Sequence, residues 1–90
     1  MSKIRIPTPL RRLTNEKDEV ESNASSISEL VVDLEEQFPG IKDRLCEDDG
    51  TIRKFINIYV NDEDIRFLDG VNTKINNEDI VSIIPAIAGG

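Results

Sequence analysis

The residues of this chain best suited to chemistry are the last two, Gly89 and Gly90. Glycine has no Cβ, so a backbone that ends in two glycines can enter a narrow channel where larger residues would clash. The carboxylate of Gly90 could then be delivered into the active site of another enzyme. Because a carboxylate is a poor electrophile, ATP would first convert it to an acyl adenylate. A persulfide or sulfide could then displace AMP and leave a thiocarboxylate on Gly90.

The composition excludes most other catalytic machinery. The chain has no histidine and a single cysteine, Cys46. Ser-His and Cys-His catalytic pairs and His-containing zinc sites are therefore excluded, as are an internal disulfide and a multi-thiolate metal site. Three acids follow Cys46 and the chain has no histidine, so what would lower the pKa of this thiol is lacking, and we interpret the residue as structural or incidental. We expect a chain that is not an enzyme and that binds no cofactor of its own.

One acidic cluster has the chemistry of a metal site but not its pattern. Asp62, Glu63 and Asp64 offer hard oxygen ligands, yet the glycine and the distal glutamate of a calcium-binding loop do not accompany them. We interpret these residues as a solvated turn and expect no metal.

Charge and length restrict the partners. The 90 residues carry 11 Lys plus Arg against 18 Asp plus Glu, a net charge of −7, which argues against nucleic acid and anionic membranes. Residues 14–50 hold 12 of the acids, and this stretch is either a solvated helix face with its loops or a surface that steers a basic partner.

We expect no leader and no membrane span, and the single cysteine favours a reducing, cytoplasmic compartment.

Hydrophobic patterns predict one helix and several short strands. Apolar residues at helical spacing run from Ile27 to Phe38, with Ser26 and Glu29 as a capping box at the start and Pro-Gly at 39–40 as the end. A short second helical turn is expected at residues 41–45 and a loop at 10–15. Strands are expected at residues 3–6, 18–21, 55–60 and 79–84, and a short strand or extended stretch at residues 65–67.

The order of these elements predicts an α+β domain. The first and last strands are natural parallel neighbours at the centre of a mixed sheet of four to five strands, with the helix across one face, which is the β-grasp arrangement. The apolar run at residues 79–84 favours a strand covered, at least in part, on both faces. We assign residues 1–84 to this domain. Because proline offers no N–H to a ladder, we assign residues 85–90 to a flexible tail that protrudes from it.

Two sets of residues are candidates for contact with a partner. Extended tails bind through backbone hydrogen bonds and side-chain pockets, and the tail residues in front of Gly90 are Pro85, Ala86, Ile87, Ala88 and Gly89. A hydrophobic docking face is expected around the base of the tail. Its candidate members are Phe55, Tyr59, Phe67 and Ile84. The alternative is that these side chains pack under loops of the domain itself.

The sequence also resembles a known family. The segment from Ile83 to Gly90, the Ile-Pro-Thr at residues 6–8 and the Asp-Leu-Glu at residues 33–35 resemble the ubiquitin-like sulfur carriers, the MoaD/ThiS family, over essentially the whole chain. The stretch from Phe55 to Phe67 is the most specific, and it is most similar to the carriers that serve cysteine biosynthesis. Many molybdopterin-synthase members carry a second proline in the tail where this chain has Ala86, which also favours the cysteine carriers.

The resemblance implies a route of sulfur transfer. An E1-like adenylating enzyme with sulfurtransferase activity would bind the exposed sheet face, adenylate Gly90 with ATP and install sulfur from a donor as a thiocarboxylate. A pyridoxal-phosphate cysteine synthase would use that sulfur on an aminoacrylate formed from activated serine. A metalloprotease would then release the cysteine and regenerate Gly90. The free carrier is expected to be a monomer.

Three other functions remain open at the level of sequence. The chain could be the small subunit of molybdopterin synthase, in a lasting complex with a large subunit. It could be a ubiquitin-like modifier that is joined to lysines through Gly90. It could also be a β-grasp module that binds partners without covalent chemistry.

Overall fold

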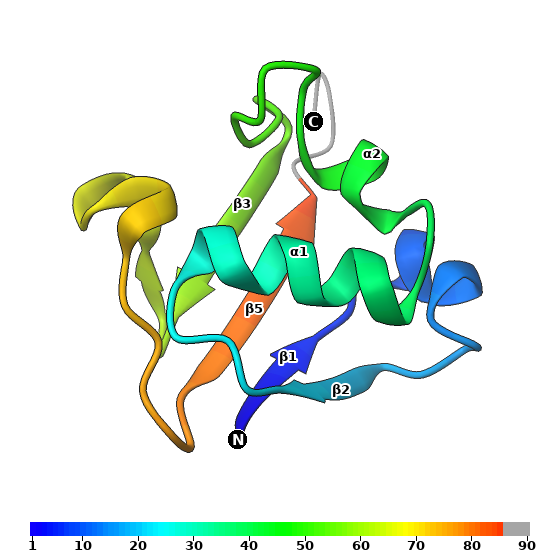
Figure 1. Ribbon diagram of the computed structural model, residues 1–90, viewed down its shortest axis with the longest axis horizontal. Helices are drawn as coiled ribbons and strands as arrows, with labels where there is room; N and C mark the ends of the chain where they lie inside the picture. Colours follow the sequence, from blue (N-terminus) through cyan, green and yellow to red (C-terminus); the bar gives the residue numbers. More distant parts are fainter. Residues whose placement is uncertain (86–90) are drawn as a thin grey trace.

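The computed structural model, described for residues 1–85, has a five-stranded sheet with two helices on one of its faces (Figure 1). The strands are β1 (Ser2–Arg5), β2 (Glu19–Ser22), β3 (Ile56–Val60), β4 (Glu63–Asp64) and β5 (Ile80–Pro85). The helices are α1 (Ile27–Gln37) and α2 (Ile41–Leu45). The short 3₁₀ helices η1 (Thr8–Leu13), η2 (Ile65–Phe67) and η3 (Gly70–Asn72) lie in the connections.

The strands follow the order β2-β1-β5-β3-β4, so the last strand of the chain lies at the centre of the sheet. β1 and β5 are parallel, with Ile4 opposite Val81. The other neighbouring pairs are antiparallel. A parallel pair needs a long crossover connection, and here that connection contains α1. The predicted β-grasp topology is confirmed.

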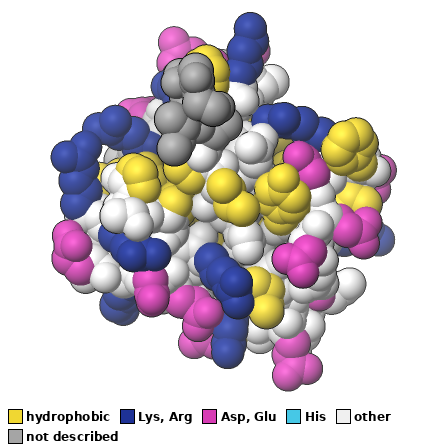
Figure 2. All heavy atoms as spheres, turned by 180° about the vertical axis from the view of Figure 1, so that it is seen from behind, with side chains coloured by type: hydrophobic (Ala, Val, Ile, Leu, Met, Phe, Trp, Pro, Cys, Tyr) yellow, Lys and Arg dark blue, Asp and Glu magenta, His cyan; other side chains and the backbone are white. Residues whose placement is uncertain are grey.

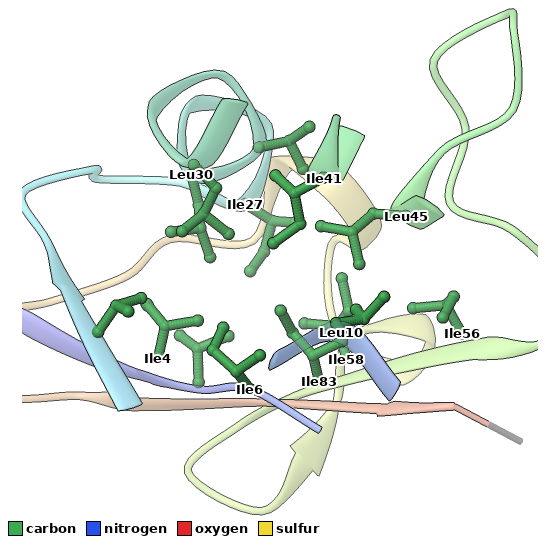
Figure 3. Packing of buried hydrophobic residues seen from close by; sticks show 14 of the residues in the cluster. Ile4, Ile6, Leu10, Ile27, Leu30, Ile41, Leu45, Ile56, Ile58 and Ile83 are labelled. Atoms are coloured by element: carbon green, nitrogen blue, oxygen red, sulfur yellow. The ribbon is translucent and has the colours of Figure 1, made fainter. Parts of the chain in front are cut away.

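Buried apolar side chains of the two layers meet between the sheet and the helices (Figure 3). Ile4, Ile58 and Ile83 point from the sheet toward the helices, and Ile27 and Leu30 point from α1 toward the sheet. All five are at most 3% exposed. Because side chains alternate between the two faces of a strand, the residues next to these in sequence lie on the opposite face of the sheet.

The start of α1 agrees with the sequence prediction in part. The Ser26 hydroxyl accepts a hydrogen bond from the N–H of Glu29 at 3.3 Å, as an N-cap should. The Glu29 carboxylate accepts from the Ser25 hydroxyl at 2.9 Å, whereas a full capping box would direct it to the Ser26 N–H. The cap therefore involves one more serine than the pattern predicted.

Two connections differ from their predictions. Residues 8–13, of which 10–13 were expected to form a loop, form the 3₁₀ helix η1. Residues 65–67, expected to be a short strand or extended stretch, form the 3₁₀ helix η2, and the chain pairs two residues earlier, at β4. Asn61 and Asp62 have positive φ angles of 51° and 72°, as in a two-residue hairpin turn. The chain therefore turns back early enough to pair at Glu63, and the Asp64 carboxylate then accepts from the N–H of Arg66 at 2.9 Å and starts η2.

One of the predictions for β5 also needs correction. The strand is central, and its second face is covered only in part, since Ile80 and Ser82 are half-buried and Ile84 is 47% exposed. Pro85, expected to begin the tail, is the last residue of β5 and lies opposite Ile56. The N–H of Asn61 donates to the carbonyl of Ile80, so these residues are a hydrogen-bonded pair of the β3–β5 ladder. Bonded and non-bonded pairs alternate along an antiparallel ladder, which makes Ile56 and Pro85 a non-bonded pair. The nitrogen of Pro85 therefore faces the β1 side. β1 pairs with β5 only up to Ser82, so the missing N–H costs no ladder bond.

We predict that Leu34→Ala lowers the free energy of unfolding by about 2–5 kcal/mol, because it opens a cavity at a fully buried position of α1. The matched control is Val32→Ala on the same helix, where the side chain is 54% exposed and the expected change is within about 0.5 kcal/mol. Urea unfolding of both variants measures the difference. Equal losses would contradict the packing of α1 against the sheet.

The junction between α1 and α2 depends on Glu35. Its carboxylate accepts from the N–H of Lys42 at 2.9 Å and from the N–H of Gly40 at 3.1 Å. Gly40 has a φ of 102°, a left-handed conformation that favours glycine. The hydrogen bonds from Lys42 and Gly40 lower the pKa of Glu35 below its ordinary value.

We predict that Glu35→Gln lowers the melting temperature near neutral pH and has less effect in acid. A carboxylate whose pKa is lower in the folded chain stabilises the fold above the ordinary value of 4.5 and loses this contribution as the pH falls through the folded pKa. The difference in melting temperature between the variant and the parent should therefore narrow below 4.5. A difference that is constant with pH would rule out the charge of Glu35 as its cause.

Candidate functional site

The candidate site begins where β5 ends. Pro85 is the last described residue, and it extends from the central strand of the sheet. The predicted tail residues Ala86, Ile87, Ala88, Gly89 and Gly90 lie outside the described residues, so their roles stay predictions. The structure places the point from which they continue: opposite Ile56, at the start of β3.

The sheet face opposite the helices brings two of the predicted docking residues together. Tyr59 lies opposite Ser82, and Ile84 lies opposite Asn57. Strand alternation puts all four side chains on the uncovered face, because Ile58 and Ile83 between them are buried on the other side. Tyr59 and Ile84 are therefore diagonal neighbours, within reach of each other across the strand pair.

The other two predicted docking residues lie outside the strands. Phe55 directly precedes β3, near the end of β5, and is 59% exposed. Phe67 lies on η2, beyond the edge strand β4, and is 87% exposed. With Ile84 these phenylalanines are accessible to a partner, so packing under loops of the domain is not the explanation for them.

Basic side chains adjoin this apolar area. The docking face predicted from the sequence did not include them. Lys3 lies opposite Ile80, and Arg5 lies opposite Ser82, both on the uncovered side of β1. The alternation of residues 3–6 already implied one face for the two bases. Their position beside β5 could be known only from the strand order, because residues 77 apart in sequence pair there.

Figure 2 shows the uncovered face as a whole. Hydrophobic side chains form a band across its middle, and Lys, Arg, Asp and Glu side chains surround the band. An apolar centre with a charged rim is the usual anatomy of a protein-binding surface. This arrangement is typical of a surface that binds another protein.

Cys46 is not part of this face. Its side chain is 4% exposed and belongs to the core between the layers. Burial raises the pKa of the Cys46 thiol, despite the opposing effect of Lys42 and Arg53. A buried thiol of raised pKa is a poor nucleophile at neutral pH, which agrees with its interpretation as structural.

The acidic turn is also accounted for locally. Asp62 lies in the hairpin turn, Glu63 and Asp64 form β4, and the Asp64 carboxylate accepts from the backbone of Arg66. Within residues 1–85 no three His, Cys, Asp or Glu side chains are grouped so that they could hold a metal ion. In the same range neither helix is long and apolar enough to cross a membrane.

Known proteins resemble this chain in sequence and in fold. Residues 4–90 match the ThiS family. Sulfur carrier protein CysO of Mycobacterium tuberculosis is 42% identical over 89 residues, which cover 97% of this chain and 96% of that protein. A solved structure of the Amycolatopsis orientalis BexX/CysO complex matches with a TM-score of 0.93 and 39% identity, both chains being covered completely. The structure of Mycobacterium tuberculosis CysO matches with a TM-score of 0.92 and 38% identity, over 97% of this chain and 100% of that one.

The fold and the central position of its last strand define a ubiquitin-like β-grasp protein. Within that class, the chain belongs to the ThiS family.

Proposed function

We propose that this protein is a sulfur carrier, which holds sulfur as a thiocarboxylate on Gly90 and donates it for cysteine biosynthesis. The observation that carries the proposal is the 42% identity to sulfur carrier protein CysO over 97% of the chain. The placement of Pro85 supports it, because the last residues continue from the central strand beside an exposed apolar face.

The chemistry on Gly90 needs an activating enzyme. The Gly90 carboxylate attacks the α-phosphorus of ATP, and pyrophosphate leaves. Hydrosulfide from a sulfur donor then attacks the acyl carbon of the adenylate, and AMP leaves with the bonding electrons. The carrier supplies the carboxylate and its position, and an E1-like adenylating enzyme supplies the acid–base groups.

The uncovered sheet face is the surface by which partner enzymes would recognise the carrier. Tyr59 and Ile84 lie on its apolar part, with Arg5 on the neighbouring strand. An enzyme bound there would have the tail directed from the end of β5 toward its active site, since Pro85 ends the same strand that carries Ile84. Phe55, next to that end, would extend the contact.

The proposed acceptor is a cysteine synthase that holds its own pyridoxal phosphate. It would use the carrier's sulfur on an aminoacrylate, and a metalloprotease would release the cysteine. The small subunit of molybdopterin synthase and the lysine-linked modifier are the alternatives. Both receive less support, because the relatives described above are named as CysO.

The first experiment tests the sulfur on Gly90. The full chain is incubated with a cognate adenylating enzyme, ATP and sulfide, and its intact mass is recorded. We predict a mass gain equal to the exchange of one oxygen for sulfur, and none after deletion of Gly90. Cys46→Ser is the control and should gain the same mass, because the buried thiol takes no part. An unchanged mass with a demonstrably active enzyme would contradict the proposal, and lysine conjugates would favour the modifier.

The second experiment tests the docking face. Ile84→Asp should raise the KM of the activating enzyme for the carrier about tenfold, because it places a charge in the apolar part of the contact. The value of kcat should change little, since Gly90 is untouched. Val32→Asp is the matched control: its side chain is similarly exposed but lies on α1, on the opposite layer.

The KM values are compared only between variants that are shown to fold. Urea midpoints of both variants show whether the domain is intact, and Ile84→Ala replaces Ile84→Asp if the charge disturbs β5. A similar rise of KM in the Ile84 and Val32 variants, or in neither, would contradict docking through the uncovered face.

A further inference from the structure

The edge strand β2 has an open side that the proposed sulfur chemistry does not use. β2 is the first strand in the order of the sheet, so only its inner side is paired, with β1. Within residues 1–85 no other strand lies beyond it. An unpaired strand edge presents backbone donors and acceptors that another extended chain can bind.

The backbone groups on the open side can be assigned. Ile6 donates its N–H to the carbonyl of Asp18 at 2.9 Å. Bonding residues alternate along an antiparallel pair, so Val20 and Ser22 also face β1, whereas Glu19 and Glu21 direct their N–H and C=O groups outward. The carbonyl of Glu21 has a weak acceptor contact with the Gln37 side chain of α1 at 3.4 Å. A peptide N–H at ordinary distance would replace that contact with a better one.

A cavity of about 670 Å³ lies along this edge, between β2 and α1. Val20 and Phe38 contribute apolar side chains to its lining, which is otherwise mainly polar. Asp33 and Gln37 line it from α1, and Lys3, Lys17, Glu19 and Glu21 line it from the sheet and the segment before β2. A strand added to β2 would direct every second side chain toward the helix side, where this cavity lies. Side chains at alternate positions of the added segment would therefore enter the cavity, where Val20 and Phe38 form its apolar part.

The acidic side chains on the other face of β2 favour a partner of positive charge. Glu19 and Glu21 are exposed on the uncovered side of the sheet, opposite Arg5 and Lys3 of β1. Among residues 1–85 the only ion pair within 4 Å joins Arg53 to Glu47, so neither acid is held by its β1 neighbour. Basic side chains on an added strand would lie beside the two acids and attract them.

The same acids disfavour a second copy of this chain at the edge. Pairing β2 with another β2 would bring glutamates of the two strands together, and like charges on neighbouring strands are destabilising. The edge is therefore protected against self-association and open to a chain of the opposite charge.

We propose that the β2 edge is a second docking surface, which binds an extended basic segment of a partner protein by strand addition. The segment carries Lys or Arg at alternate positions, next to Glu19 and Glu21, and apolar residues between them that enter the cavity beside Val20 and Phe38. This surface lies at the edge of the sheet remote from β4, and it leaves the face around Tyr59 and Ile84 free for another partner.

The probe is a synthetic peptide of alternating arginine and isoleucine residues, added to the full chain at physiological salt. Binding should shift the amide resonances of residues 19–22 and give a measurable Kd by fluorescence anisotropy. The double reversal Glu19→Lys with Glu21→Lys should weaken binding about tenfold or more, because two attractive cross-strand pairs become repulsive. The matched control, Glu63→Lys with Asp69→Lys, changes net charge equally near the opposite edge and should alter Kd less than about threefold.

Two control peptides separate strand addition from charge attraction alone. A fully N-methylated peptide keeps its charges but donates no backbone hydrogen bond, and it should bind much more weakly. A peptide with glutamate in place of arginine should not bind. The proposal is overturned if the first peptide fails to bind, if N-methylation has no effect, or if the shifts centre on α1 or on the β3–β5 face. Equal effects of the two double reversals would overturn it as well.

Discussion

The parallel pairing of β1 with β5 is the contact on which the rest of the structure depends. It joins the two ends of the chain, with Ile4 opposite Val81 at the centre of the sheet. A parallel pair requires a crossover, and the crossover brings α1 and α2 over one face, where their apolar side chains bury those of the sheet. The pairing also makes the last strand central. The residues after Pro85 therefore continue from the central strand of the sheet.

Covering a sheet on one side has a functional consequence. Residues 1–85 contain one main amphipathic helix and one short one, which is enough to bury the face of Ile58 and Ile83 but not the opposite face. That opposite face changes in character from strand to strand: apolar at β5, basic at β1 and acidic at β2. A single sheet face can in this way present surfaces of different chemistry to different partners. Recognition would then depend on other residues than the carboxylate proposed to react at Gly90.

Much of this arrangement could be predicted from local patterns. Helical spacing from Ile27 to Phe38 located α1, because apolar residues recur at each turn of an amphipathic helix. Alternation located β1 and β3 in the same way. The errors at η2 and β4 arose because a three-residue segment with apolar ends, such as Ile65–Phe67, can form a strand or a 3₁₀ turn. The positive φ angles at Asn61 and Asp62 decided between the two. Such angles depend on the pairing of the hairpin as well as on residue type.

The sequence by itself determined the fold class, the lack of histidine chemistry and the Gly-Gly end, because these follow from residue type and short-range spacing. Only the tertiary structure decided which exposed residues share a surface. Tyr59 and Ile84 become neighbours through the register of β3 and β5, and Arg5 joins them through the parallel pairing of β1. It also decided that Pro85 belongs to a strand, since the missing N–H of proline is harmless only beyond the end of β1. Long-range register sets these relations, and no local pattern contains it.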